Sequence, residues 1–219
     1  MRIRQHAALG LAATACLVLS ACTNAADWNA NRSSQIHSFD TSSIQAQPDI
    51  IAKLPQGALE DGVLDVAAST DYAPAEFLDP SGKAVGYDVD LTNAIAAVLG
   101  VKGTVHTAEF DSIIASVGSK YDAGISSFTV TPERIGEVNM TAYINVGSRF
   151  NVQAGNPKGV ETSDHLKLCG RTIGVQVGTA QETTMRDAAE KCAQAGKPVL
   201  SVRSYSKQSE ATTGLVGGT

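Results

Sequence analysis

Residues 63–125 alternate between apolar strand patterns and amphipathic helix patterns, and this alternation constrains the fold more than any other sequence feature. The alternating segments are predicted strands at residues 63–68, 101–107 and 123–125, with predicted helices at 88–99 and 110–117. Such an order is typical of a parallel sheet covered by helices, so we predict an α/β fold. The residues predicted to form the buried stripe of the first helix are Leu91, Ile95, Val98 and Leu99.

A turn rich in hydroxyl groups follows the third predicted strand, within residues 122–134. Thr131 and Pro132 predict a helix start, with a hydroxyl at the N-cap and proline at the first helical position. The groups that can bind an anion here come from Ser126, Ser127, Thr129 and Arg134. Because a guanidinium can hold both oxygens of a carboxylate, we interpret this stretch as a carboxylate clamp. The alternative is an ordinary strand-to-helix turn with a surface arginine.

A second α/β unit begins with a predicted strand at residues 172–177 and repeats the same device. The turn that follows, Gly178 to Glu182, opens a helix and can offer further amide donors to an anion, from Thr179, Ala180 and Gln181. As a phosphate loop it is weak, because it has few glycines and no following lysine. A strand at residues 199–205 and a helix from residue 206 complete the pattern.

Two aromatic residues lie at or next to the carboxyl ends of predicted strands, where ligands bind in sheets of this kind. Tyr72 would cover an apolar ligand side chain with its ring, and the alternative is a tyrosine at the edge of the core. Phe110 begins the second helix. Asp88 and Asp90 are interpreted as helix caps in preference to metal ligands.

The first 21 residues have the pattern of an export signal: a basic start at Arg2 and Arg4, then an apolar run at residues 7–19 that is too short to span a membrane as a helix. Leu19-Ser-Ala-Cys22 resembles the bacterial lipobox. That resemblance implies cleavage before Cys22 and lipidation of this cysteine, which would anchor the protein to a membrane outside the cytoplasm. The alternative is a plain secretory signal. The polar residues 22–47 are predicted to form a flexible tether.

Charge and cysteine usage exclude several functions. Loss of Arg2 and Arg4 with the signal would change the formal net charge from −5 to −7, so nucleic acid is an improbable partner. Without Cys16 and Cys22, the cysteines left in an oxidising compartment are Cys169 and Cys192, and we expect them to form one disulfide. The scattered histidines and two lone cysteines make a poor metal site, so no metal or cofactor is predicted.

Six motifs, in order and spacing, resemble the bacterial extracellular solute-binding proteins of family 3, the amino-acid-binding proteins of ABC importers. They lie at residues 72–77, 86–91, 110–114, 121–127, 131–134 and 174–182. The resemblance implies the type II periplasmic-binding-protein fold, with two α/β lobes joined by crossing segments. Its expected boundaries are lobe 1 at residues 48–147, a crossing at 148–154 and a partial lobe 2 at 155–219. It also supports the disulfide.

The resemblance implies a role for each candidate residue. Arg134 would bind the ligand α-carboxylate with help from Thr129 and from amides near Thr179, Ala180 and Gln181. Ser126 and Ser127 would take part of the α-ammonium, and Tyr72 and Phe110 would sandwich the ligand side chain. The implied partners are a free amino acid and the importer permease with its ATPase, and the implied state is a monomer. Ala75, Ser69 and Ala180 depart from residues common in the family, so the preferred amino acid does not transfer.

Family members continue beyond the equivalent of residue 219, through an aspartate that accepts the ligand ammonium and a second crossing. We therefore expect this sequence to be C-terminally incomplete, with an unfinished second lobe and return crossing, and to bind amino acids more weakly than a longer form.

Two other function classes compete with a binding protein. A few relatives are amino-acid dehydratases or cell-wall lytic enzymes, and such an enzyme would need an acid or base in the site. Glu76 is the carboxylate that the sequence places nearby. A sensor subunit of a signalling receptor would need a second membrane span or a cytoplasmic module, and the sequence shows neither.

Overall fold

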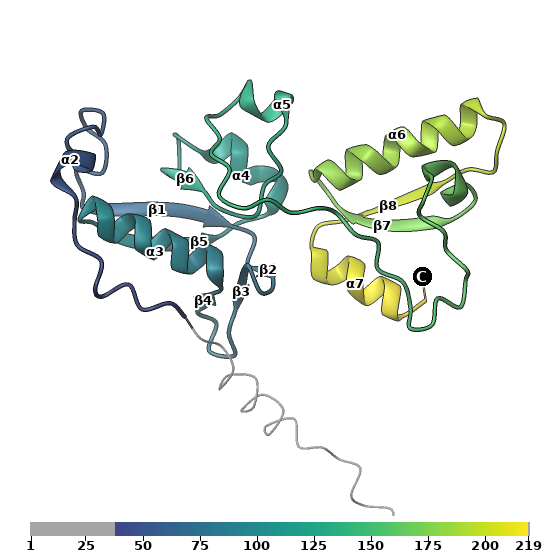
Figure 1. The fold of residues 1–219 in the computed structure, drawn as a ribbon, viewed down its shortest axis with the longest axis horizontal. Coiled ribbons are helices and arrows are strands. Elements are labelled where there is room, and N and C mark those ends of the chain that lie inside the picture. Colours follow the sequence, from purple (N-terminus) through teal and green to yellow (C-terminus); the bar gives the residue numbers. More distant parts are fainter. Residues whose placement is uncertain (1–37, 219) are drawn as a thin grey trace, which may run out of the picture. The chain divides into compact units, whose positions relative to one another are not determined.

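A computed structural model describes residues 38–218 (Figure 1). The predicted signal at residues 1–21, the lipidation site Cys22 and the first part of the predicted tether lie outside them. Residues 38–47 bond to the helix α3 (Tyr87–Leu99), since the Phe39 N–H donates to Asp90 and the Gln47 N–H to the Val98 carbonyl. Among the residues described, no helix combines the length and apolar character that a membrane span requires.

A parallel sheet in the order β5-β1-β6 organises the first part of the chain. Its strands are β1 (Val63–Ala68), β5 (Lys102–Thr107) and β6 (Ala123–Gly124). Val66 pairs with Val105 on one side and with Ala123 on the other. The central position of β1 explains its apolar sequence, because a strand with neighbours on both sides and a helix across it is buried. The helix α4 (Phe110–Ser116) lies between β5 and β6 in sequence, as predicted.

Three short antiparallel strands are inserted between β1 and α3: β2 (Asp71–Tyr72), β3 (Glu76–Leu78) and β4 (Ala84–Val85). They bring the start of α3 against the backbone of residues 74 and 75, where the Asp88 N–H donates to the Ala75 carbonyl at 2.9 Å. Gly86 makes this approach possible. A Cβ at Gly86 would lie 2.2 Å from the Ala75 carbonyl oxygen, and its φ of +120° is one that side chains rarely adopt.

Helix α3 buries a face that differs from the predicted stripe. Its buried side chains are Asp88, Val89, Thr92 and Ala96, whereas Ile95 is 37% exposed. Ala96 packs with Leu64 and Val66 of β1. The small residues allow close packing of the helix on the sheet, and this contact places the larger aliphatic residues toward the edges of the buried face. The helix ends at Leu99, as predicted, and Gly100 follows it in a left-handed conformation.

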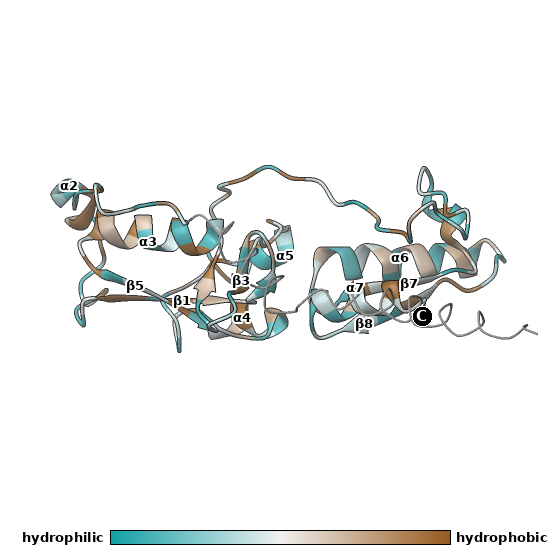
Figure 2. Cartoon of the chain, turned by 90° about the horizontal axis from the view of Figure 1, so that it is seen from below, coloured by the Kyte–Doolittle hydropathy of each residue, from teal (hydrophilic) through white to brown (hydrophobic). Residues whose placement is uncertain are grey.

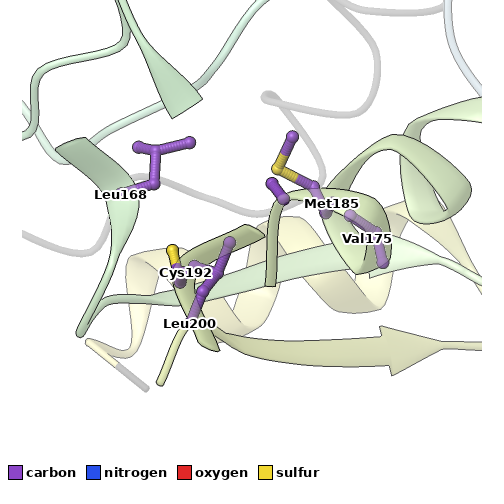
Figure 3. Packing of buried hydrophobic residues seen from close by; sticks show 6 residues of the cluster. Leu168, Val175, Met185, Cys192 and Leu200 are labelled. Carbon is purple, nitrogen blue, oxygen red and sulfur yellow. The ribbon is translucent and has the colours of Figure 1, made fainter. Parts of the chain in front are cut away.

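The second α/β unit contains a 3-10 helix η1 (His165–Leu168), β7 (Thr172–Gln176), α6 (Ala180–Gln194), β8 (Ser201–Tyr205) and α7 (Gln208–Val216). β7 and β8 pair in parallel, and α6 and α7 cover opposite faces of the pair (Figure 1). Leu168, Val175, Met185 and Leu200 pack around Cys192 beneath α6 (Figure 3). Cys169 and Cys192 are bonded, with Cα atoms 5.6 Å apart, which confirms the predicted disulfide.

The short helix α5 (Pro132–Ile135) follows β6. Residues 138–163 then connect this helix to the second α/β unit. Extended segments are predicted at residues 138–154, but the structure has no strand there. Apolar side chains along this segment are exposed, and they are Tyr143, Ile144, Val146, Phe150 and Val152. Figure 2 shows that hydrophilic and hydrophobic residues are mixed along α3 and α6.

Candidate functional site

The turn after β6 is fixed by two carboxyl groups that lie far away in the sequence. The Ser126 hydroxyl donates to Glu76 Oε1 at 2.6 Å and accepts from the Ser69 N–H at 3.0 Å. The Ser127 N–H and hydroxyl both contact Asp88 Oδ2 at 3.2 Å. Ser127 also has φ +51°, an uncommon conformation for a residue with a side chain. Both serine hydroxyls are therefore engaged within the protein, and the backbone is what this turn can offer a ligand.

The predicted helix cap at Asp88 is wrong. Gly86 is the N-cap of α3, and no side chain caps it. Asp88 is 1% exposed and accepts hydrogen bonds from Ser127 and from the Tyr143 hydroxyl, the latter at 2.7 Å. The Tyr143 ring is exposed but its hydroxyl is partly buried, and this partial burial, followed by the hydrogen bond to Asp88, raises the pKa of the phenol. Asp88 thus joins the Ser127 turn to the start of the connecting segment.

Arg134 lies on α5 and its guanidinium is held between main-chain carbonyls. Thr131 caps this helix by accepting from the Arg134 N–H, which confirms the predicted helix start. Nη1 donates to the Thr129 carbonyl at 2.7 Å and Nη2 to the Gly178 carbonyl at 2.8 Å. Arg134 is 9% exposed, and burial lowers the pKa of its guanidinium. No acidic side chain among residues 38–218 forms an ion pair with it.

Two aromatic rings lie beside Arg134. Phe110 is buried and stacks on Phe128, with ring centroids 4.5 Å apart. The Arg134 guanidinium lies near both rings, 5.8 Å from the first and 5.4 Å from the second. Tyr72 is 45% exposed on β2. The structure therefore brings Phe110 to Arg134, and the sandwich of Tyr72 and Phe110 around a ligand side chain remains a prediction. Phe128 was missed, although an aromatic residue inside a polar turn is a signal that the sequence contains.

The second predicted turn starts α6 and is held by local bonds. Thr179 is the N-cap: its hydroxyl accepts from the Glu182 N–H and donates to the Gln176 carbonyl at 2.7 Å. Glu182 accepts from the Gly178 N–H at 2.8 Å. Within the described residues, the N–H groups of Thr179, Ala180 and Gln181 have no hydrogen-bond partner. They are the free donors of the helix start. The Gln181 side chain donates to Ser148 in the connecting segment.

Gly178 is fitted closely against α4. A Cβ at this position would lie 2.7 Å from Asp111 Cβ, and its φ is +74°. Two further bonds involve residues near Tyr72. The Gln176 side-chain amide donates to the Ser69 hydroxyl at 3.4 Å, and the Ser209 N–H donates to Asp71 Oδ2 at 3.0 Å.

The donor set suits an anion better than a metal ion. Among the residues described, no group of three or more His, Cys, Asp or Glu side chains could hold a metal. A buried guanidinium, two aromatic rings and a helix start with free amides are instead typical of a site for a small carboxylate.

Comparison with known proteins identifies the family of the chain. Residues 64–212 match the family of bacterial extracellular solute-binding proteins, family 3. The chain is 30% identical over 215 residues to the arginine-binding protein ArgT of Corynebacterium glutamicum, and the match covers 97% of this chain and 67% of that protein. It is 33% identical to the L-cystine-binding protein TcyJ of Escherichia coli, over 58% of this chain and 48% of TcyJ. The chain thus spans about two thirds of the first relative and about half of the second.

Solved structures of amino-acid-binding proteins share the fold. An ancestral arginine-binding protein bound to arginine is 28% identical to this chain, with a TM-score of 0.59. The match covers 72% of this chain and 66% of the ancestral protein. AncCDT-1, an ancestral amino-acid-binding protein and precursor of cyclohexadienyl dehydratase, is 29% identical with a TM-score of 0.64, covering 73% and 68%. The fold is the α/β, two-lobed fold of type II periplasmic binding proteins. The chain belongs to the bacterial extracellular solute-binding proteins, family 3.

Proposed function

We propose that this protein captures a free amino acid outside the cytoplasm and presents it to the permease of an ABC importer, as a monomer and without chemistry. The Arg134 guanidinium would bind the ligand α-carboxylate. The free N–H groups of Thr179, Ala180 and Gln181 would complete the carboxylate site, and the backbone of Ser126 and Ser127 would face the α-ammonium. Relatives named as arginine-binding and L-cystine-binding proteins support an amino acid as the ligand.

The observation that carries this proposal is the unpaired charge of Arg134. Its guanidinium is buried, and its hydrogen bonds go to two neutral carbonyl oxygens. A guanidinium has five N–H donors and stays protonated in proteins, so donors remain for a ligand. A buried charge without a partner is unfavourable. An incoming carboxylate would supply the missing negative charge, and the Phe110 and Phe128 rings would keep water from the pair.

The test is calorimetric titration with the common amino acids, L-cystine, and matched amines that lack the carboxylate. L-Arginine and agmatine are such a pair, because they differ by the α-carboxylate. We expect an amino acid to bind and its amine to bind at least about thirtyfold more weakly, in line with the roughly 2–5 kcal/mol lost when one partner of a buried charged pair is removed. Equal binding of both members of the pair would refute the clamp, and no binding of any amino acid would refute the function.

An enzyme is a weaker candidate. AncCDT-1 shows that a dehydratase lineage exists among similar structures, and Glu76 has the raised pKa of a general acid. However, Glu76 is 1% exposed, so neither of its oxygens is accessible to a substrate. Conversion of prephenate by the purified protein would favour the enzyme, and its return unchanged would favour binding.

The proposed location is the outer surface of a membrane, with a lipid on Cys22. Labelled palmitate should be incorporated into the wild-type protein and not into Cys22→Ser, which should appear in the soluble extracytoplasmic fraction. An unlabelled wild type would indicate a plain secretory signal instead.

A further inference from the structure

Glu76 is an acid enclosed at the centre of the turn network. It lies in β3, opposite Tyr72 of β2, and is 1% exposed. The close contact at Gly86 brings the start of α3, and with it Asp88, to the same place. Two adjacent serines then use two neighbouring carboxyl groups, because Ser126 bonds to Glu76 and Ser127 bonds to Asp88.

The two carboxyl groups differ in their hydrogen bonds. Asp88 accepts from the Ser127 N–H, the Ser127 hydroxyl and the Tyr143 hydroxyl, so each of its two oxygens has a donor. Glu76 Oε1 accepts one bond from Ser126, and its Oε2 is buried with no partner among residues 38–218. An ionised oxygen would lose its solvation here without gaining a donor, whereas a neutral carboxyl loses less.

The charges around Glu76 act in the same direction. The titratable groups that face it are the Asp88 carboxyl from α3, the Asp71 carboxyl from β2 and the Tyr143 phenol from the connecting segment. None of them is a cation. Burial, followed by the charge of Asp88, raises the Glu76 pKa from 4.5 to about 9, although the Ser126 hydrogen bond opposes this.

We propose that Glu76 is a positioning residue that acts in its neutral form, holding the Ser126 hydroxyl so that the Ser126–Ser127 backbone keeps the conformation the ligand requires. The Ser126 hydroxyl donates to Glu76 and accepts from the Ser69 N–H. The next residue, Ser127, donates to Asp88. Ionisation of Glu76 would place two adjacent charges beneath this turn and distort it. This inference rests on the proposed function, because the affected property is amino-acid binding.

The conservative variant Glu76→Gln tests the proton directly, because glutamine copies the neutral shape and cannot ionise. The folded wild type retains a proton that the unfolded chain releases above pH 4.5, so wild-type stability falls with rising pH until the folded pKa is passed. Between pH 5.5 and 8.5 the unfolding constant of the wild type should rise about tenfold per pH unit relative to that of Glu76→Gln. Glu60→Gln, at an exposed glutamate, serves as the matched control and should follow the wild type.

Binding of L-arginine gives the second readout. The ratio of the wild-type Kd to the Glu76→Gln Kd should be near one at pH 7 and rise about tenfold by pH 10, because only the neutral form is competent. Titration of the ligand ammonium cancels in this ratio. A ratio that stays constant with pH would overturn the positioning role. If Glu76→Gln does not fold, carbon-13 titration of the wild-type carboxyl decides: a midpoint near the ordinary value, or no matching titration of the Ser69 amide, would overturn it.

The two hypotheses can fail separately. Suppose that neither the wild type nor Glu76→Gln binds L-arginine at pH 7, but their unfolding constants show the expected pH dependence. The ligand assignment is then wrong and the proton on Glu76 is established. If both proteins bind at pH 7 and the ratio of their unfolding constants is independent of pH, the proposed function holds and the proton on Glu76 is refuted.

Discussion

The two strand-to-helix turns of the site begin alike and are held differently. Each has a threonine N-cap whose hydroxyl accepts a backbone N–H from the first turn of its helix. At residues 126–134 the supporting bonds come from Glu76 and Asp88, 50 and 39 residues away in the sequence. At residues 178–182 the bonds of the Gly178 N–H and of the Thr179 hydroxyl are to residues three or four positions away, whereas the Gly178 carbonyl accepts from Arg134.

The difference also decides the charge of each turn. The first turn carries a buried cation, Arg134, with neutral partners. The second contains its own anion, because Glu182 occupies the Gly178 N–H and pairs with Arg186. The same threonine-capped turn can therefore carry a net positive charge for a ligand or have its charges neutralised within the protein, depending on the residues packed against it. The amides beyond Gly178 supply donors, and Arg134 supplies the charge.

The comparison is tested most strongly by Arg134→Ala. We expect the loss of L-arginine affinity to be about 2–5 kcal/mol, because the ligand carboxylate would lose its charged partner inside a desolvated site. Isothermal titration calorimetry measures the loss, and circular dichroism checks that the fold is kept. Arg203→Ala is the control at an exposed arginine and should bind normally. Near-normal affinity of Arg134→Ala would show that the first turn is no receptor.

The disulfide belongs to the second turn's unit, since Cys192 lies on α6. Replacing both cysteines by serine should lower the free energy of unfolding by roughly 3 kcal/mol, because the unfolded chain regains the freedom of a loop of 23 residues. Hydrogen exchange should accelerate in α6 and stay unchanged at Ser127. Equal acceleration at both places would mean that the two turns are not independently held. Mass spectrometry of alkylated, unreduced protein must first find no free thiol at Cys169.

Asp88→Asn tests the remote support of the first turn. The asparagine NH2 group would face the Ser127 and Tyr143 groups that donate to Asp88, so one carboxylate acceptor would be replaced by a donor. We therefore expect a loss of about 1–3 kcal/mol in unfolding free energy and faster exchange of the Ser127 amide. Urea denaturation gives the first quantity. Asp90→Asn, in the same helical turn but less buried, is the control and should cost less. If the two variants are equally mild, the Ser127 contacts contribute little.

The smallest effect is expected for Glu182→Gln, which removes the internal anion of the second turn. Burial opposes ionisation, but hydrogen bonds from Ser204, Arg186 and Gly178 lower the Glu182 pKa below 4.5. Its stabilisation is therefore present above about pH 4.5 and is lost as the pH falls through the lowered pKa. At pH 7 we expect a loss of about 1 kcal/mol. The loss should become smaller as the pH falls below about 4.5, whereas the exposed control Glu190→Gln should show none at pH 7 or in acid.

Local sequence signals predicted most of the elements and the N-cap Thr131. The strand at residues 63–68 has the predicted bounds, and Thr131 caps α5 as expected, because apolar periodicity and capping depend on residues only a few positions apart. The prediction of which face of α3 is buried was wrong. The period alone favoured its large aliphatic residues, and the small residues Thr92 and Ala96 that fit the sheet were undervalued.

The candidate site was predicted in composition and only partly in contacts. Arg134 lies against Phe110 and beside the second turn, but Ser126 and Ser127 face carboxyl groups inside the protein. A single sequence does not show which residues 39 or 50 positions apart will meet, so the partners of Glu76 and Asp88 could not be read from it. The lobe boundaries at residues 147 and 154 remain predictions, as do the individual ligand contacts.

Gly178 sets a limit on the mutational tolerance of the site. Its φ of +74° and the distance of 2.7 Å that would separate an added Cβ from Asp111 Cβ are two independent obstacles to any side chain. Shortening Asp111 to glycine would remove the Cβ contact and leave the backbone Cα at 3.0 Å, with the φ unchanged. In a saturation library, position 178 should therefore reject substitutions even in a background that has been given more space, while the exposed neighbour Gln181 accepts many.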